Sequence, residues 1–405
     1  MQPAEAERPS PRVRARLPAA WRYASRHAAR DDRIDLLRGL VMLVILVNHV
    51  ALPSLFHVLS VEAVGVVTGA EAFVLLSGLI LGVVHGPRFR SGAGRDATRR
   101  LLRRAWQLYA VAAVTSAVVY AVGLALGNAA ASLTTYTDPR TQQTFSLYGN
   151  APDPAELAWG LVTLAYGPGA LNVLGLYVAL VLIAPALLWA LRRGWWLPLL
   201  ALSWAVYAAF HADPPRVLPS QSENAFPVLA WQVLFVHGVT AGYHRAQLGR
   251  FARGTWGRVT LGAAGALTLA LAFFALNNPW YDIPGGLRLH LIPEDVYFDW
   301  YAGWFQRAKL GLGRVVNTFA LLTVLYALLT VCWVPVERAL GRLLIPIGRA
   351  TLYVFVVHLA FVLLAAQFPA LQRGHVLLNT AAHAAVIAVT WWLVTRRVLF
   401  RVIPR

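Results

Sequence analysis

The stretch at residues 33–50, RIDLLRGLVMLVILVNHV, decides the fold class of this chain and raises the main question about its function. It has the composition of a membrane-spanning helix, because its apolar residues are nearly continuous. Yet it carries Asp35 and Arg38 in its first turns and His49 near its other end. Ionisable groups at bilayer depth are costly and mark functional sites. These three side chains are therefore the first candidates for a site.

The overall composition supports a membrane protein. The chain has 405 residues, of which 58% are hydrophobic and 13% are charged, and its mean hydropathy is positive. A soluble protein of this length cannot bury so much apolar surface, so a polytopic membrane protein is predicted. The single cysteine, Cys332, lies in an apolar run and excludes an intramolecular disulfide.

The hydropathy pattern predicts an all-α protein with about ten transmembrane helices, each of about 20 residues as a bilayer requires. The predicted spans are 36–56, 62–85, 105–127, 168–191, 195–211, 226–243, 259–276, 314–334, 344–366 and 375–395. The apolar stretch 155–166 is too short to cross and is expected to be interfacial or re-entrant. Residues 1–30, rich in Arg, Pro and Ala, are expected to form a disordered cytoplasmic tail, and 31–405 the membrane domain.

Basic residues test this topology, because cytoplasmic loops of membrane proteins are enriched in Lys and Arg. With the N-terminus inside, 29 of the 36 basic residues fall on the cytoplasmic side. They include the arginines of the loop 86–104. Both termini are therefore predicted to be cytoplasmic. Membrane topology, and not nucleic-acid binding, then explains the net charge of +18.

The spacing within the first span places its ionisable groups on one helix face. Arg38 and His49 are 11 residues apart, which is close to a whole number of turns and to about 16 Å of rise. Asp35 and Arg38 then lie at the cytoplasmic mouth and His49 in the outer half of the bilayer. Because a short outer turn joins the first two spans, Glu71 is expected at the depth of His49. We predict an acid–base pair in which Glu71 orients and charges the imidazole of His49.

Structural roles explain some of these residues as well and stay open at this stage. A histidine within a span can be a packing residue that is hydrogen-bonded across helices, and this applies to His49 and to the second such histidine, His358. Asp35 with Arg38 can mark a helix start, where the arginine reaches back to the interface. The Ser77–Gly78 pair favours close helix packing over catalysis.

Aromatic and acidic residues gather in the predicted outer loop 277–313. They are Trp280, Tyr281, Tyr297, Trp300, Tyr301 and Trp304, with the carboxylates Asp282, Glu294, Asp295 and Asp299. Such rings are typical of the interfacial belt of membrane proteins. They equally favour a sugar-binding surface, where rings stack on pyranoses and carboxylates accept bonds from hydroxyls.

The opening stretch, followed by GAEAFVLLSGLILG at 69–82, resembles the OpgC family of membrane succinyltransferases, which modify osmoregulated periplasmic glucans. That family belongs to the integral-membrane acyltransferase (acyltransferase 3) superfamily, whose hallmark of an Arg, ten residues and a His is matched by Arg38 and His49. The similarity continues in ALNVLGLYVALVLIAPAL (170–187), FPVLAWQVLFVHG (226–238), KLGLGRVVN (309–317) and IGRATLYVFVVH (347–358). The Arg-rich tail and the residues before Glu71 depart from the pattern, which leaves the acceptor and the acyl group open.

The resemblance implies an acyl-CoA donor from the cytosol, succinyl-CoA first, and no permanently bound cofactor or metal. Four loop arginines are then expected to bind the coenzyme A phosphates, although positive-inside bias explains each one: Arg99, Arg100, Arg103 and Arg104. Contacts with the acceptor or the acyl group are assigned to Tyr177, Trp231, Gln232, Lys309 and Arg314. The last two are cations that would suit the distal carboxylate of a succinyl group.

The expected reaction is an O-acyl transfer across the cytoplasmic (inner) membrane. His49 acts as general base on a sugar hydroxyl, whose oxygen attacks the thioester; a covalent acyl-histidine is the competing route. The expected partners are acyl-CoA, an extracytoplasmic oligo- or polysaccharide and the bilayer, with no nucleic acid and a homodimer allowed. The alternatives are an O-acetyltransferase of a cell-surface polysaccharide and, less readily, a transporter or glycan exporter, since the chain shows no internal repeat.

Overall fold

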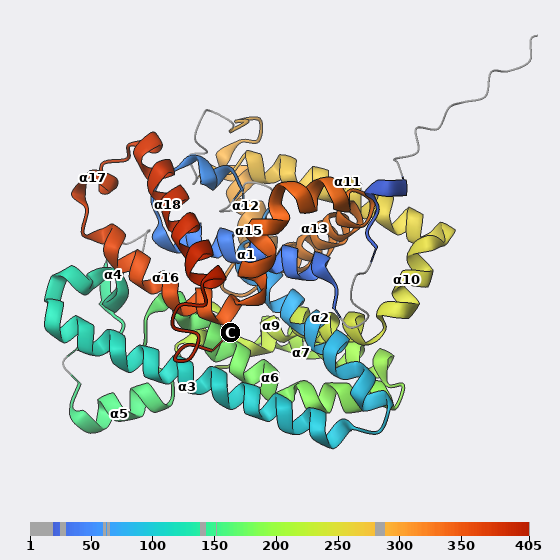
Figure 1. Ribbon diagram of the computed structural model, residues 1–405, viewed down its shortest axis with the longest axis horizontal. Coiled ribbons are helices and arrows are strands. Elements are labelled where there is room, and N and C mark those ends of the chain that lie inside the picture. Colours follow the sequence, from blue (N-terminus) through green and yellow to red (C-terminus); the bar gives the residue numbers. More distant parts are fainter. Residues whose placement is uncertain are drawn as a thin grey trace, which may run out of the picture.

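The computed structural model describes residues 19–24, 30–59, 62, 65–137, 143–150, 152–279 and 288–404. Within these ranges the chain is helical except for one short hairpin, β1 (Thr135–Thr137) and β2 (Thr144–Ser146), which confirms the all-α class (Figure 1). Most of the predicted tail 1–30 lies outside the described residues. So do Trp280, Tyr281 and Asp282 of the aromatic outer loop.

Every predicted span coincides with a helix. These helices are α1 (Asp32–Val50), α2 (Gly69–Arg90), α3 (Gly94–Leu126), α6 (Asn172–Arg192), α7 (Trp196–Ala212), α9 (Val228–Tyr243), α11 (Thr255–Leu276), α13 (Leu312–Val331), α15 (Arg342–Arg349) with α16 (Thr351–Ala366), and α18 (Val376–Thr395). Short helices connect them: α4 (Ala131–Thr134), α5 (Pro154–Val162), α8 (Ser222–Ala225), α10 (Arg245–Arg253), α12 (Glu294–Trp304), α14 (Trp333–Val336) and α17 (Pro369–Gln372). Short 3-10 turns and a π-helix (Glu337–Gly341) complete the chain.

Six helices of the described ranges are long and apolar enough to cross a membrane: α2, α3 with its continuation to Thr134, α6, α11, α13 and α18. A seventh span results if the bent pair Trp333–Arg349 and Thr351–Ala366 is taken as one. Helices α7 and α9 are apolar but shorter. These helices make the chain a membrane protein. The count of ten spans and the cytoplasmic termini stay predictions.

Several predicted boundaries are wrong. Helix α2 begins at Gly69 and not at 62, and α3 begins at Gly94 and not at 105. The first span was expected to reach residue 56, but α1 ends at Val50, where Ala51 adopts a left-handed conformation with φ of 53°. The ninth span, 344–366, is not one helix, because the chain turns by 94° between α15 and α16 at Ala350. The short stretch 155–166 does form a small, largely exposed helix, α5.

The break at Ala350 follows from how tightly α15 packs against α1. A Cβ atom on Gly39 would clash with the carbonyl oxygen of Leu344, and one on Gly348 would clash with that of Asp35. Glycine is therefore required at both positions for the two backbones to approach so closely. The contact fixes the start of α16 beside the charged first turns of α1.

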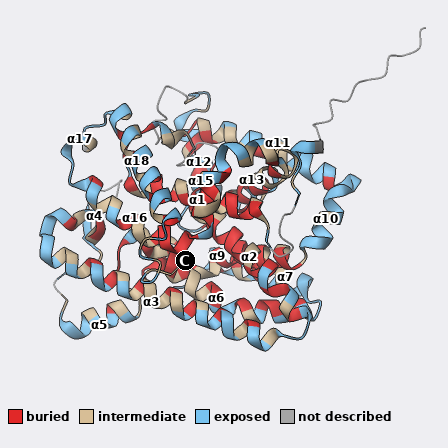
Figure 2. Cartoon of the chain, viewed as in Figure 1, coloured by how far each residue is buried: buried red, intermediate tan, exposed pale blue. Residues whose placement is uncertain are grey.

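Helices α2 and α9 form the centre of the molecule through the same kind of contact. Gly78 and Gly82 of α2 lie against the backbone of α9, and Gly238 and Gly242 of α9 lie against the backbone of α2. These small residues recur every four positions, which is the spacing that lets membrane helices pack closely. The prediction of packing for Ser77–Gly78 agrees with this contact. Figure 2 shows buried residues concentrated in this middle region and exposed residues along α3, α5 and α10.

Candidate active site

Two histidines from helices far apart in the sequence meet at one hydrogen bond. Nδ1 of His49 on α1 lies 2.8 Å from Nε2 of His358 on α16, and the ring centroids are 4.9 Å apart. Nδ1 of His358 lies 2.7 Å from the carbonyl oxygen of Phe355, one turn back on α16. His358 is 1% exposed, whereas His49 is partly exposed. The pair therefore has a buried member and a member that a substrate can approach.

The carbonyl of Phe355 fixes where the protons of this pair lie. A carbonyl oxygen only accepts hydrogen bonds, so Nδ1 of His358 carries a proton. In the neutral ring Nε2 of His358 is then an acceptor, and Nδ1 of His49 must donate to it. Nε2 of His49 is left with its lone pair free, and within the described part of the chain it accepts no hydrogen bond. This is the state that a general base requires.

The Arg38 end of α1 is held by polar contacts between α1, α15 and α16. Nη2 of Arg38 donates to Oγ1 of Thr351 at 2.7 Å, and Nη1 lies 3.9 Å from a carboxylate oxygen of Asp35. Asp35 also accepts from Arg30 at 2.6 Å and from Arg349 at 3.2 Å. Asp35 is thus an anchor for three arginines and holds the mouth of the helix pair together.

Aromatic rings connect the Arg38 end to the histidine pair. Phe355 lies between Thr351 and His358 on α16, with its ring centroid 6.3 Å from that of His49. Phe73 of α2 stacks on Phe355 at 6.0 Å, and Tyr177 of α6 contacts Phe73 at 5.7 Å. The predicted site residue Tyr177 therefore belongs to an apolar wall that runs from Arg38 to His49.

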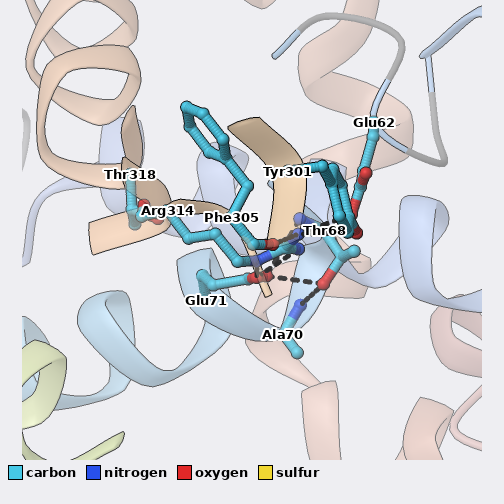
Figure 3. A network of polar contacts seen from close by, with 8 residues as sticks. All are labelled: Glu62, Thr68, Ala70, Glu71, Tyr301, Phe305, Arg314 and Thr318. Atoms are coloured by element: carbon cyan, nitrogen blue, oxygen red, sulfur yellow. Dashed lines mark hydrogen bonds and ion pairs between the residues drawn. The ribbon is translucent and has the colours of Figure 1, made fainter. Parts of the chain in front are cut away.

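The predicted pair of His49 and Glu71 is wrong. One carboxylate oxygen of Glu71 accepts a bond of 2.7 Å from Nε of Arg314 on α13. The other accepts from the backbone and hydroxyl of Thr68, at 2.9 and 2.5 Å, and so closes a capping box at the start of α2 (Figure 3). Both carboxylate oxygens of Glu71 are bonded to these partners, and neither is bonded to the imidazole of His49.

Arg314 joins two carboxylates in this network. Figure 3 shows its guanidinium between Glu71 and Glu62, and Nη1 donates to Glu62 at 2.6 Å. The same nitrogen lies 3.3 Å from the carbonyl oxygen of Phe305, and the hydroxyl of Tyr301 donates to Glu62 at 3.2 Å. Arg314 and Glu71 are fully buried, with 0% exposure. Breaking such a pair leaves an uncompensated buried charge and costs about 3–5 kcal/mol. The network therefore fixes the α1–α2 connection to α13, and Arg314 is not free for an acyl carboxylate.

The arginines expected to bind coenzyme A differ in their surroundings. Arg99, Arg100 and Arg103 are exposed on the first turns of α3. Arg104 is half-buried and donates to Gln107 at 2.8 Å. A role of these four arginines in binding coenzyme A stays a prediction.

Trp231 and Gln232 lie inside the helix bundle. Trp231 is 0% exposed and packs edge-on against Phe226 at 4.9 Å. Gln232 accepts a hydrogen bond from Ser203 at 2.7 Å and donates to the backbone of the same residue at 2.8 Å, which ties α9 to α7. The ring contact of Trp231 and the hydrogen bonds of Gln232 connect parts of the helix bundle. A role of these two residues in substrate binding stays a prediction.

The aromatic outer segment divides its rings between two environments. On α12, Tyr297 and Tyr301 are buried, and Tyr297 stacks on Phe274 at 4.4 Å. Trp300 and Trp304 are exposed, at 58% and 53%. The carboxylates Glu294, Asp295 and Asp299 are exposed beside them. The exposed surface of α12 therefore presents the two tryptophans and the three carboxylates, whereas the two tyrosines belong to the core.

Three participants escaped the sequence analysis. Glu62, Thr351 and Arg349 each contact a predicted residue, but their partners lie far along the chain; Thr351, for example, is 313 residues from Arg38. His358 was noted as a second intramembrane histidine, and its proximity to His49 had no local signal. Its presence in the stretch 347–358, which resembles the family, was the one available hint.

Comparison with known proteins gives one match. No curated protein and no solved structure matches the chain. The model of the OpgC protein family matches residues 30–401, which is nearly the whole described chain. The matched region includes the histidine pair, the Arg38 mouth and the Arg314 network. The chain belongs to the OpgC family, the membrane succinyltransferases of periplasmic glucans that its first two spans resemble.

Proposed function

We propose that this protein transfers a succinyl group from cytosolic succinyl-CoA to a hydroxyl of an extracytoplasmic glucan, with His49 as the general base. The observation that carries the proposal is the hydrogen bond between Nδ1 of His49 and Nε2 of His358, whose own Nδ1 lies against the carbonyl of Phe355. Nε2 of His358 accepts a hydrogen bond from Nδ1 of His49. The other nitrogen of His49, Nε2, is then unprotonated and can act as a base at a partly exposed position. Membership in the family supplies the reaction class, an acyl transfer.

The reaction proceeds by proton removal and acyl exchange. Nε2 of His49 takes the proton of the sugar hydroxyl while its oxygen attacks the thioester carbonyl carbon. The carbon–sulfur bond then breaks, and the departing coenzyme A sulfur receives the proton that His49 holds. The products are the succinyl ester of the glucan and free coenzyme A, and His49 returns to its starting state. His358 positions the ring throughout and touches neither substrate.

The donor enters from the side of Arg38. Arg38 provides positive charge at one end of the apolar wall, and His49 lies about 16 Å away along α1. An extended pantetheine arm has this length scale and an apolar character that suits the rings of Phe73 and Phe355. The exposed arginines at the start of α3 stand where the phosphates of coenzyme A would remain in the cytosol.

The acceptor approaches from the opposite face. In Figure 1 the basic helix α10 lies at one edge of the molecule, and α4, α5 and α17 lie at the other. The proposal has both termini on the cytoplasmic side of the cytoplasmic membrane. The exposed Trp300 and Trp304 of α12, with their neighbouring carboxylates, are suited to stack on and hydrogen-bond glucose units.

The test is a transfer assay with the purified full chain in lipid nanodiscs. Succinyl-CoA and a glucan oligosaccharide are supplied, and mass spectrometry follows the ester while a thiol reagent follows coenzyme A. We expect the wild type to form both products and His49→Ala to lower the rate by about 10²–10⁴-fold, which is the usual contribution of a general base.

His375→Ala is the matched control, because His375 is exposed at the start of α18 and has no part in the proposed site. This variant should keep the wild-type rate. Full turnover by His49→Ala would refute the role of the histidine, and a wild type that consumes no acyl-CoA would refute the function. A succinylated His49 trapped without acceptor would replace direct transfer by a covalent route.

A further inference from the structure

An apolar cavity of about 480 Å³ lies between α1, α15 and α18, three helices that pack side by side (Figure 1). Its volume is within the range of small-molecule binding sites. All the residues that line it are apolar. Two of them, Leu340 and Trp391, are 45% and 37% exposed. The cavity is therefore an open groove on the side of the molecule and not a closed void.

The groove lies on the side of α1 that faces away from the candidate active site. Four residues of this helix line it: Leu40, Leu43, Val44 and Val47. These positions are about 140–240° around the helix from Arg38, whereas His49 is nearly in line with Arg38. The groove is therefore separate from the histidine pair, although the same helix forms one wall of each.

Two small residues of α18 leave room in the groove. Ala384 and Ala388 are one turn apart, line the groove and are exposed. The groove extends for about 10 Å along α1, from Leu40 to Val47. This length fits within one leaflet, which is half of the about 30 Å of hydrocarbon in a bilayer. An open apolar groove of this length in a membrane-spanning domain is suited to a lipid acyl chain.

One end of the groove is basic. The indole Nε1 of Trp391 donates to the carbonyl oxygen of Arg342 at 2.8 Å and joins α18 to α15 at this end. Arg342 is exposed, and so is Arg338 in the π-helix that contains the lining residue Leu340. Arg396 is exposed at the end of α18, five residues after Trp391. Arginines therefore lie within about one turn of the lining residues of both walls.

The charge and the aromatic residues at this end fit the head group of an anionic lipid. The segments 336–342 and 391–397 hold four arginines and one carboxylate, Glu337. Tryptophan is enriched at the depth of the lipid head groups, which places Trp391 and Trp392 at the interface. Basic pockets between membrane helices bind anionic head groups. The π-helix is also a rare conformation that is frequent at functional sites.

We propose that this groove binds one anionic phospholipid. Its acyl chain lies along α1 between α15 and α18, and its phosphate lies beside Arg342 and Arg396. The bound lipid stabilises α1 from the side opposite to Arg38 and His49. This site is independent of the group that the enzyme transfers.

The test measures lipid binding to the purified full chain in detergent by native mass spectrometry. Phosphatidylglycerol and phosphatidylcholine with the same acyl chains are titrated separately, and the dissociation constant of the first bound lipid is determined. Ala388→Phe fills the groove, and the double variant Arg342→Gln, Arg396→Gln removes its charge. Thermal unfolding without added lipid checks that each variant is folded.

Two exposed positions away from the groove provide matched controls, Ala266→Phe on α11 and Arg253→Gln on α10. Both should bind phosphatidylglycerol as the wild type does. Because the hydrogen bond from Trp391 is made to the backbone of Arg342, the arginine variants keep the contact between α18 and α15.

We expect the wild type to bind phosphatidylglycerol at least about tenfold more tightly than phosphatidylcholine. The double arginine variant should lose roughly fivefold per arginine in its affinity for phosphatidylglycerol and keep its affinity for phosphatidylcholine. Ala388→Phe should weaken the binding of both lipids by at least about tenfold, as when two methylene groups are displaced from the groove. Its unfolding midpoint should stay that of the wild type.

Equal wild-type affinities for the two lipids would overturn the proposal, and so would wild-type lipid binding by Ala388→Phe. A loss in Arg253→Gln as large as that per arginine in the double variant would show attraction by the overall charge and not a site. A dimer that Ala388→Phe dissociates would mean that a second copy of the chain covers the groove. None of these measurements involves acyl transfer, so each leaves the proposed function intact.

Discussion

Two clusters of ionisable residues in this protein differ in how their charges are compensated and in whether a substrate can reach them. In the Arg314 network, Glu62 and Glu71 bind one guanidinium, and Thr68 donates to the second oxygen of Glu71. Arg314 and Glu71 have no exposed surface. In the histidine pair, two rings share one hydrogen bond, and Nε2 of His49 keeps a free lone pair at a partly exposed position.

The difference separates a scaffold from a reactive site. Opposite charges that compensate one another in a buried environment connect helices and are closed to a substrate. A neutral ring with one nitrogen committed and the other free can exchange a proton. The burial of an ionisable group is therefore not enough to identify a catalytic residue. A nitrogen or oxygen that has no hydrogen-bond partner and that a substrate can reach is the better sign.

The largest expected effect is on stability, when the buried charges of the Arg314 network are left unpaired. Arg314→Met leaves two buried carboxylates without their cation, and we expect a loss of about 3–5 kcal/mol in the free energy of unfolding. Thermal unfolding in nanodiscs measures it. The triple variant Arg314→Met, Glu62→Gln, Glu71→Gln should be more stable than the single one, because it removes the unpaired charges. Wild-type stability of Arg314→Met would show that the network does not contribute to the free energy of unfolding.

The next effect concerns the orientation of His49. His358→Phe removes the hydrogen-bond acceptor that orients the ring of His49. We expect kcat to fall by about 10–10²-fold, as when the hydrogen-bond partner of a functional histidine is removed. KM for acyl-CoA should change little. His358→Gln, which can still accept through its amide oxygen, should recover part of the rate. Equal KM and kcat losses in both variants, together with a lower unfolding midpoint, would make His358 a packing residue.

A smaller effect is expected where α15 crosses α1. Gly348→Ala places a methyl group against the carbonyl of Asp35, and overpacking of this kind costs about 1–3 kcal/mol. Because α16 starts directly after this contact, the displacement should also raise KM for acyl-CoA. Gly249→Ala, in α10 with no neighbour within 4 Å of the added atom, is the control and should change neither quantity.

The smallest effect is expected at the Arg38 mouth. Thr351→Val removes the hydroxyl that accepts from Arg38, and the loss of about 0.5–1.5 kcal/mol for one hydrogen bond corresponds to roughly a two- to tenfold rise in KM for acyl-CoA. Steady-state kinetics with saturating acceptor measure this rise. An unchanged KM with a lower kcat would place Thr351 in the chemical step and not at donor entry.

Local patterns were enough to predict the helices and the Arg38–His49 spacing. Apolar runs mark each helix, and one helix fixes the distance and face of residues within it. The sharp turn at Ala350 was missed, because it depends on Gly39 of another helix lying against Leu344. Hydropathy contains no information on such a crossing.

Partners across helices could not be predicted for the same reason. Glu71 seemed suited to His49 because both were expected at one depth, yet its partner Arg314 is 243 residues away. His358 reaches His49 from 309 residues away. Depth in the bilayer is set by position along a helix, but the direction in which a side chain points depends on which helices pack together.

The most direct test of the two roles measures turnover and thermal unfolding in His49→Ala and Glu71→Gln side by side. We expect His49→Ala to lose at least about 10²-fold in succinyl transfer and to keep the wild-type unfolding midpoint. Glu71→Gln should keep turnover within about threefold and lose about 1–3 kcal/mol of stability, the cost of an unsatisfied buried group. Loss of turnover in Glu71→Gln with an unchanged midpoint would contradict this account and return Glu71 to the reaction.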